Sequence, residues 1–136
     1  MNSVEQTINE YRARLRRLEY LREKIDAQER VINSIGITYD EHISGGKKTP
    51  ITERIAILAD LQDDAYDEER ELIEVSNKIV RISRQLGTIN VNYQKVIDYS
   101  ILGSQSQNQI ARLMGITQAR VSQLLKEALE KAEGLI

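Results

Sequence analysis

Residues 107–125 read QNQIARLMGITQARVSQLL, and this stretch decides the fold. It places small or apolar residues where two short helices joined by a sharp turn must pack. Ala111 leaves room for the second helix to cross close by, and Gly115 is free to take the positive φ that turns the chain. The remaining inward positions are apolar: Ile110, Met114, Ile116, Val121 and Leu124. The stretch predicts a helix-turn-helix whose two helices are capped by Ser106 and Thr117.

The polar face of the second helix predicts the contacts with DNA. A helix N-terminus directs free N–H groups and partial positive charge at phosphates, so residues 117–119 would approach bases or backbone. Arg120 and Gln123 carry the guanidinium and amide groups that read guanine or adenine in the major groove. Lys126 and Arg112 are better placed for phosphates. The predicted DNA-binding residues are Arg112, Thr117, Gln118, Ala119, Arg120, Ser122, Gln123 and Lys126.

Residues 90–132, NVNYQKVIDYSILGSQSQNQIARLMGITQARVSQLLKEALEKA, resemble region 4 of bacterial sigma factors, where a helix precedes a helix-turn-helix. The whole chain is similar to the ArpU and RinA-like late-gene activators of Gram-positive phages and prophages. This resemblance implies sequence-specific promoter binding and control of late or packaging genes. Gln109 stands where the family often has an acid. The chain has no counterpart of sigma region 2, so promoter melting is not implied.

Upstream of residue 88, the apolar spacing predicts two long helices. Apolar residues at intervals of three, four and seven positions form a stripe from about residue 3 to residue 35, and Gly36 would end this first helix. Residues 36–50 contain three Gly and the only Pro, which predicts a loop. The stripe resumes over 51–86, with Thr52 as the expected N-cap and Gly87 as the stop. Two long helices joined by one loop predict an antiparallel hairpin.

The expected fold is all-α: a long, coiled-coil-like helical hairpin followed by a three-helix, helix-turn-helix domain. The domain boundaries are 1–86 for the hairpin, with its loop at 36–50, and 88–136 for the DNA-binding part. Asn90 or Asn92 would cap the third helix. Polar residues such as Arg22 and Glu29 interrupt the hairpin stripes, so we expect the hairpin to form a homodimer.

The composition excludes several other classes of protein. The chain has 136 residues and no Cys, which rules out disulfides, Cys-based zinc sites and thiol nucleophiles. No apolar run suits a membrane span, and the charged N-terminus does not resemble a signal peptide, so a bacterial cytoplasm is expected. His42 is the only His and lies in the predicted loop, which argues against metal or catalysis. We therefore expect no enzyme activity, no cofactor and no metal.

The net charge of −2 hides an uneven distribution of charge along the chain. Residues 1–35 and 87–136 each carry +1, whereas residues 51–86 carry −4. The basic run at 12–17, RARLRR, is nearly balanced by neighbouring acids and is better explained as a solvated helix face. The acidic second helix lacks the Glu-x-x-His pairs of di-metal bundles. Its acidic face would instead suit a basic protein, with host RNA polymerase as a candidate partner.

The sequence predicts a DNA-binding transcriptional regulator that acts on double-stranded promoter or operator DNA. The alternative is a phage packaging component like a small terminase subunit, which also joins a helix-turn-helix to helical oligomerisation segments. Small terminase subunits usually place the DNA module first and form rings, whereas here the module comes last. A third hypothesis is an adaptor that binds polymerase without DNA.

Overall fold

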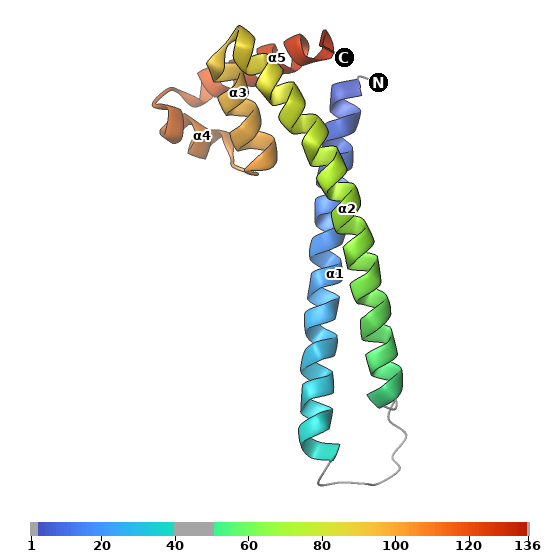
Figure 1. Cartoon of the computed structure of the whole chain (residues 1–136). Helices are drawn as coiled ribbons and strands as arrows, with labels where there is room; N and C mark the ends of the chain where they lie inside the picture. Colours follow the sequence, from blue (N-terminus) through green and yellow to red (C-terminus); the bar gives the residue numbers. More distant parts are fainter. Residues whose placement is uncertain (1–2, 40–50, 136) are drawn as a thin grey trace. The chain divides into compact units, whose positions relative to one another are not determined.

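The computed structural model describes residues 3–39 and 51–135, and every element in these ranges is a helix (Figure 1). The chain is all-α, with a long antiparallel helical hairpin followed by a three-helix, helix-turn-helix domain, as predicted. The elements are α1 (Ser3–Tyr39), α2 (Ile51–Ile89), α3 (Val91–Ile97), the π-helical η1 (Asp98–Leu102), α4 (Gln107–Met114) and α5 (Gln118–Glu133). The described residues form two compact units: Ala13–Leu72, and a second unit that combines residues up to Arg12 with those from Ile73 onward.

The first helix does not end where the sequence predicts. α1 continues through Gly36 to Tyr39, because glycine permits the left-handed conformation that ends a helix but does not impose it. The first four residues of the predicted loop are therefore helical, and residues 40–50, with His42, lie outside the described residues. α2 begins at Ile51, which places Thr52 inside the first turn and not at the cap.

The end of α2 also differs from the prediction, because Gly87 lies inside the helix. A Cβ at this position would collide with the side-chain amide of Gln94 on α3, so the missing side chain makes room for the next helix. α2 ends at Ile89, and Asn90 then adopts an extended conformation. Its side chain accepts a hydrogen bond of 2.9 Å from the backbone N–H of Asn92. Of the two predicted caps for α3, Asn90 is the one used.

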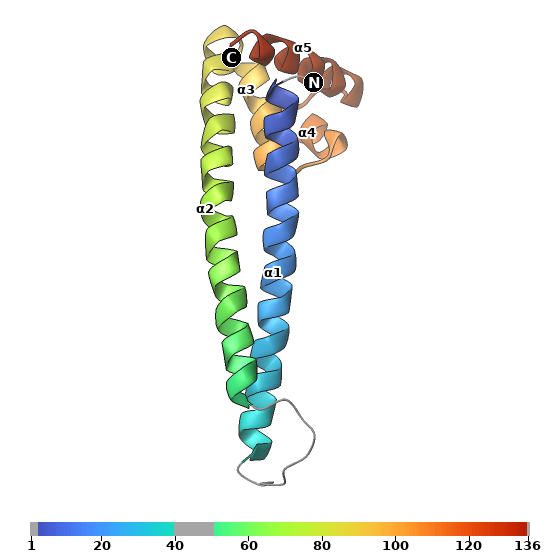
Figure 2. The same ribbon diagram turned by 90° about the vertical axis from the view of Figure 1, so that its right-hand side faces the viewer.

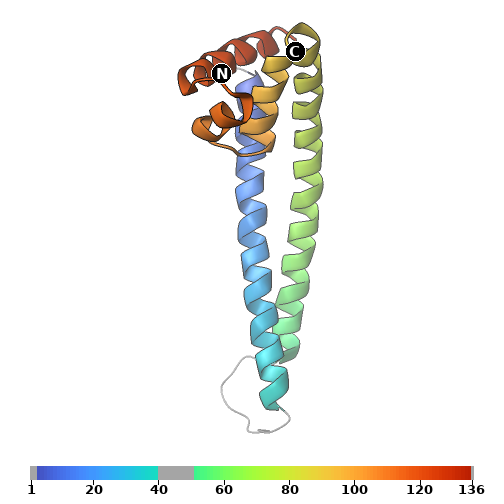
Figure 3. The same ribbon diagram turned by 90° about the vertical axis from the view of Figure 1, so that its left-hand side faces the viewer.

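The unit that contains the helix-turn-helix has a continuous apolar core. α3 and α4 both pack against α5. Figures 2 and 3 show the start of α1 beside these C-terminal helices, where the N–H groups of Ser3 and Val4 each donate 3.2 Å hydrogen bonds to the Glu133 carboxylate. The buried residues come from every helix of the unit and include Val4, Ile8, Ile79, Leu86, Val96, Ile97, Ile101, Ile110, Val121, Leu124, Ala128 and Ala132. The helices of the helix-turn-helix therefore share one core with the first turns of α1.

A buried serine connects α2 to η1. Ser83 is 1% exposed, and its hydroxyl donates a 2.5 Å hydrogen bond to the carboxylate of Asp98. A buried hydroxyl costs free energy unless it has a partner, so this bond explains how a polar residue is accommodated within an apolar face. Asp98 is also the first residue of η1, and its carbonyl accepts from the N–H of Gly103, where η1 ends. The contact fixes α2 to the segment that leads into α4.

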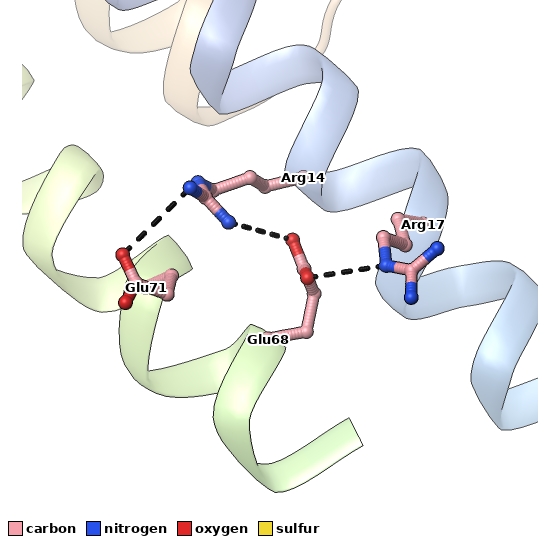
Figure 4. Close-up of polar contacts among 4 residues, drawn as sticks. All are labelled: Arg14, Arg17, Glu68 and Glu71. Atoms are coloured by element: carbon pink, nitrogen blue, oxygen red, sulfur yellow. Dashed lines mark hydrogen bonds and ion pairs between the residues drawn. The ribbon is translucent and has the colours of Figure 1, made fainter. Parts of the chain in front are cut away.

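In the unit of Ala13–Leu72, α1 and α2 run side by side in opposite directions (Figure 1). Among the side chains of this unit that the structure describes, residues 13–35 and 51–72, only Leu18 and Leu21 are buried. Ion pairs supplement this small core: Glu68 contacts Arg14 at 3.1 Å and Arg17 at 3.3 Å, and Glu71 contacts Arg14 at 3.7 Å (Figure 4). The hairpin is therefore held in part by charges across its two helices.

Candidate DNA-binding site

The helix-turn-helix begins with a reciprocal cap on α4. The Ser106 hydroxyl accepts a 3.2 Å hydrogen bond from the Gln109 backbone N–H, and the Gln109 side-chain oxygen accepts one of 2.9 Å from the Ser106 N–H. Ser and Gln at this spacing form a capping box, which satisfies two donors that would otherwise lack partners. Gln109 thus provides the acceptor that an acid at this position would offer, so the difference from the sigma pattern leaves the cap intact.

The turn between α4 and α5 depends on one glycine. Gly115 has a φ of 67°, in the left-handed region that favours glycine. The backbone N–H of Ile116 returns a 3.0 Å hydrogen bond to the carbonyl of Ala111, which satisfies the end of α4. Ala111 is buried, as its predicted place at the helix crossing requires. The sequence prediction of this turn is confirmed.

The start of α5 presents backbone N–H groups that precede its first intrahelical hydrogen bond. Thr117 is the N-cap, as predicted, and its hydroxyl accepts a 3.1 Å hydrogen bond from the backbone N–H of Arg120. The N–H groups of Gln118 and Ala119 precede the first intrahelical bond of α5, which runs from Val121 to Thr117. These N–H groups and the positive end of the helix dipole give the start of α5 the character of a phosphate-binding end.

All eight residues predicted to contact DNA are exposed, and they belong to one compact unit. At 100° per residue, Ala119, Gln123 and Lys126 lie opposite the apolar face of α5. That apolar face, which includes Val121 and Leu124, is buried against the neighbouring helices. The structure therefore separates a packing face from a polar face on α5, and the predicted contacts fall on the polar face and its edges.

Arg120 lies at the edge of α5 that faces α3, where it belongs to a polar network that the sequence analysis missed. Its guanidinium is 3.8 Å from the carboxylate of Glu127, two turns further along α5. The other carboxylate oxygen of Glu127 accepts a 3.1 Å hydrogen bond from the phenol of Tyr93 on α3. No spacing rule could reveal this contact, because the position of Tyr93 depends on how α3 packs against α5.

Burial raises the pKa of the Tyr93 phenol above its ordinary value of 10.0. The hydrogen bond to Glu127 and its negative charge act in the same direction, whereas the positive charge of Arg120 acts against them. A phenol is protonated at neutral pH and can donate to Glu127, and the raised pKa of Tyr93 extends this donor state to higher pH.

A hollow of about 260 Å³ lies beside this network, between α3, α4 and α5. Arg120 and Lys95 contribute positive charge to its lining, and Leu124 belongs to its apolar part. The lining also contains Asn92, Tyr99, Leu113, Met114 and Ile116. Two cations from different helices thus line one surface feature at the edge of the predicted DNA-binding face.

Residues 86–131 match the family Sigma-70, region 4. The matched range starts at the end of α2 and includes α3, η1, α4 and nearly all of α5. This part of the chain is therefore a sigma-region-4-like DNA-binding domain, and the protein is a DNA-binding regulator. Such a domain binds DNA and is not itself catalytic. No curated protein and no solved structure matches the chain.

Within residues 3–39 and 51–135, no three His, Cys, Asp or Glu side chains are grouped in a way that could hold a metal ion. Among the helices in the same ranges, none is long and apolar enough to cross a membrane.

Proposed function

We propose that this protein is a homodimeric, phage- or prophage-encoded transcription regulator that binds promoter or operator DNA through α5 and controls late or packaging genes. The observation that carries the proposal is the helix-turn-helix itself, in which Ser106, Gly115 and Thr117 fix two helices and leave the polar face of α5 exposed. The phage origin and the late-gene role rest on the resemblance of the whole chain to the ArpU and RinA-like activators.

Selection from a random DNA library tests sequence-specific binding directly. We expect the wild-type protein to enrich a defined sequence and to bind it more tightly than a scrambled duplex at moderate salt. We also expect a phage or prophage promoter fragment to be bound more tightly than random duplex. No enrichment of any sequence would contradict the proposed function.

Two substitutions separate base readers from phosphate contacts. Gln123→Ala should cost about 1–3 kcal/mol of binding free energy on the enriched sequence and little on a scrambled duplex, because an amide discriminates between base edges. Arg112→Ala should weaken both complexes to a similar extent and lower the salt slope by about one. Both effects can be measured by titration at several salt concentrations. Equal weakening by Gln123→Ala on both duplexes would assign Gln123 to the backbone.

The homodimer is the second part of the proposal, and the unit of Ala13–Leu72 supports it. Large apolar side chains on α2 stay open to solvent, with Ile55 50% and Tyr66 64% exposed. The unit that reads DNA carries little net positive charge, so two recognition helices per complex would strengthen binding. Light scattering should give a dimer, whereas a ring of about eight to ten copies would favour a packaging role and contradict this part of the proposal.

A further inference from the structure

The two carboxylate oxygens of Glu127 contact residues on two helices, α3 and α5. Both helices belong to the DNA-binding unit, which combines residues up to Arg12 with those from Ile73 onward. One oxygen, Oε2, accepts the 3.1 Å hydrogen bond from the Tyr93 phenol. The other oxygen, Oε1, lies 3.8 Å from Nη1 of Arg120. Tyr93 belongs to α3, which packs against α5, so its phenol approaches Glu127 from a neighbouring helix. The carboxylate that faces Arg120 is therefore oriented by a second helix and not by α5 alone.

This contact fixes a direction for the Arg120 side chain. Long side chains on helices lean towards the N-terminus of their own helix. Glu127 lies seven residues in the opposite direction, roughly 10 Å along the helix axis. The ion pair thus draws the guanidinium towards α3, where Arg120 and Lys95 line the same hollow. Without the pair, an arginine that is 45% exposed would sample several rotamers.

We propose that Tyr93 and Glu127 are positioning residues that hold Arg120 in the orientation used to select a DNA sequence. This inference rests on the proposed function and adds two residues outside the predicted DNA-binding face. The physical reason is preorganisation: a side chain that is already held in its bound orientation loses less conformational entropy when DNA binds. The phenol donates the hydrogen bond that orients the Glu127 carboxylate.

Tyr93→Phe provides the cleanest test, because it removes the hydrogen bond without changing the net charge. The probes are the tightest duplex that the wild-type protein selects from a random library and a scrambled duplex of the same composition. We expect the ratio of the two affinities to fall about fivefold, the effect of one hydrogen bond. In an Arg120→Ala background, Tyr93→Phe should leave the ratio unchanged, since there is no guanidinium left to position.

A matched pair of charge variants separates positioning from simple repulsion of DNA. Glu127→Gln and Glu130→Gln each remove one negative charge from α5, so both should strengthen binding to every duplex. Only Glu127 contacts Arg120, so only Glu127→Gln should lower the ratio between selected and scrambled duplex. If Glu127→Gln leaves this ratio unchanged or raises it, Glu127 does not hold Arg120 in an orientation that selects a DNA sequence. That result would overturn the inference.

Two controls exclude a purely structural role for Tyr93. Tyr20→Phe, at a 53% exposed position of α1 in the unit of Ala13–Leu72, should leave the ratio unchanged, and thermal unfolding should show that Tyr93→Phe remains folded. If the loss of selectivity persists in the Arg120→Ala background, Tyr93 acts on the domain in general and the inference fails. If the wild-type protein selects no sequence, the proposed function fails instead, so the two failures are distinguishable.

Discussion

The two compact units contain similar residues but bury them to different degrees. In the DNA-binding unit, Leu86, Ile110 and Val121 are each 0% exposed, because several helices enclose them. Among residues 13–35 and 51–72, only Leu18 and Leu21 are buried. Two helices share one line of contact, so few side chains can be surrounded. The DNA-binding unit thus carries its own core, whereas the hairpin unit of Ala13–Leu72 relies on ion pairs and, in our proposal, on a second copy.

Paired leucine truncations should give the largest effect. Leu124→Ala removes a side chain that is 1% exposed and leaves a cavity beside α5, so we expect a loss of about 3–4 kcal/mol in the free energy of unfolding. Leu61→Ala removes a half-buried leucine from α2 and should cost about 1–2 kcal/mol. Denaturant titration measures both. Equal losses at the two positions would mean that the hairpin unit has a core as complete as that of its neighbour.

Two glycines provide the next largest contrast. Gly115→Ala should cost about 1–2 kcal/mol, because a Cβ is disfavoured at a φ of 67°, although no neighbouring atom lies within 4 Å of it. Gly87→Ala gains up to about 1 kcal/mol of helix propensity and must displace only the end of the Gln94 side chain. Its net effect on stability should therefore be smaller than that of Gly115→Ala. Thermal unfolding of both variants can rank them, and the reverse order would contradict the left-handed turn.

The hairpin ion pairs should give the smallest effects. Glu68→Gln removes the carboxylate that contacts both Arg14 and Arg17, and the Glu68 side chain is only 11% exposed, so we expect a loss of about 1 kcal/mol at low salt. Glu71 is 54% exposed and contacts Arg14 at 3.7 Å, so Glu71→Gln should cost no more than about 0.3 kcal/mol. The Glu68 effect should shrink in 1 M salt through screening. An effect that does not depend on salt would point to packing and not to charge.

Local chemistry was sufficient to predict most of the DNA-binding part. Ser106, Gly115 and Thr117 act through their immediate neighbours, so their roles as caps and turn could be read from the order of residues. The ends of the long helices were less predictable. Gly36 and Gly87 lie inside helices, because a glycine only permits a stop and the residues around it decide whether the helix continues.

The all-α class, the helix-turn-helix and the polar face of α5 follow from the order of residues alone, because helical periodicity and capping are local properties. Which distant residues meet depends instead on how the helices pack. The packing of α3 on α5 places Tyr93 at Glu127, and the approach of α1 to α5 lets Glu133 accept from the N–H groups of Ser3 and Val4. These contacts depend on how helices pack in three dimensions, and no spacing along the chain encodes that geometry.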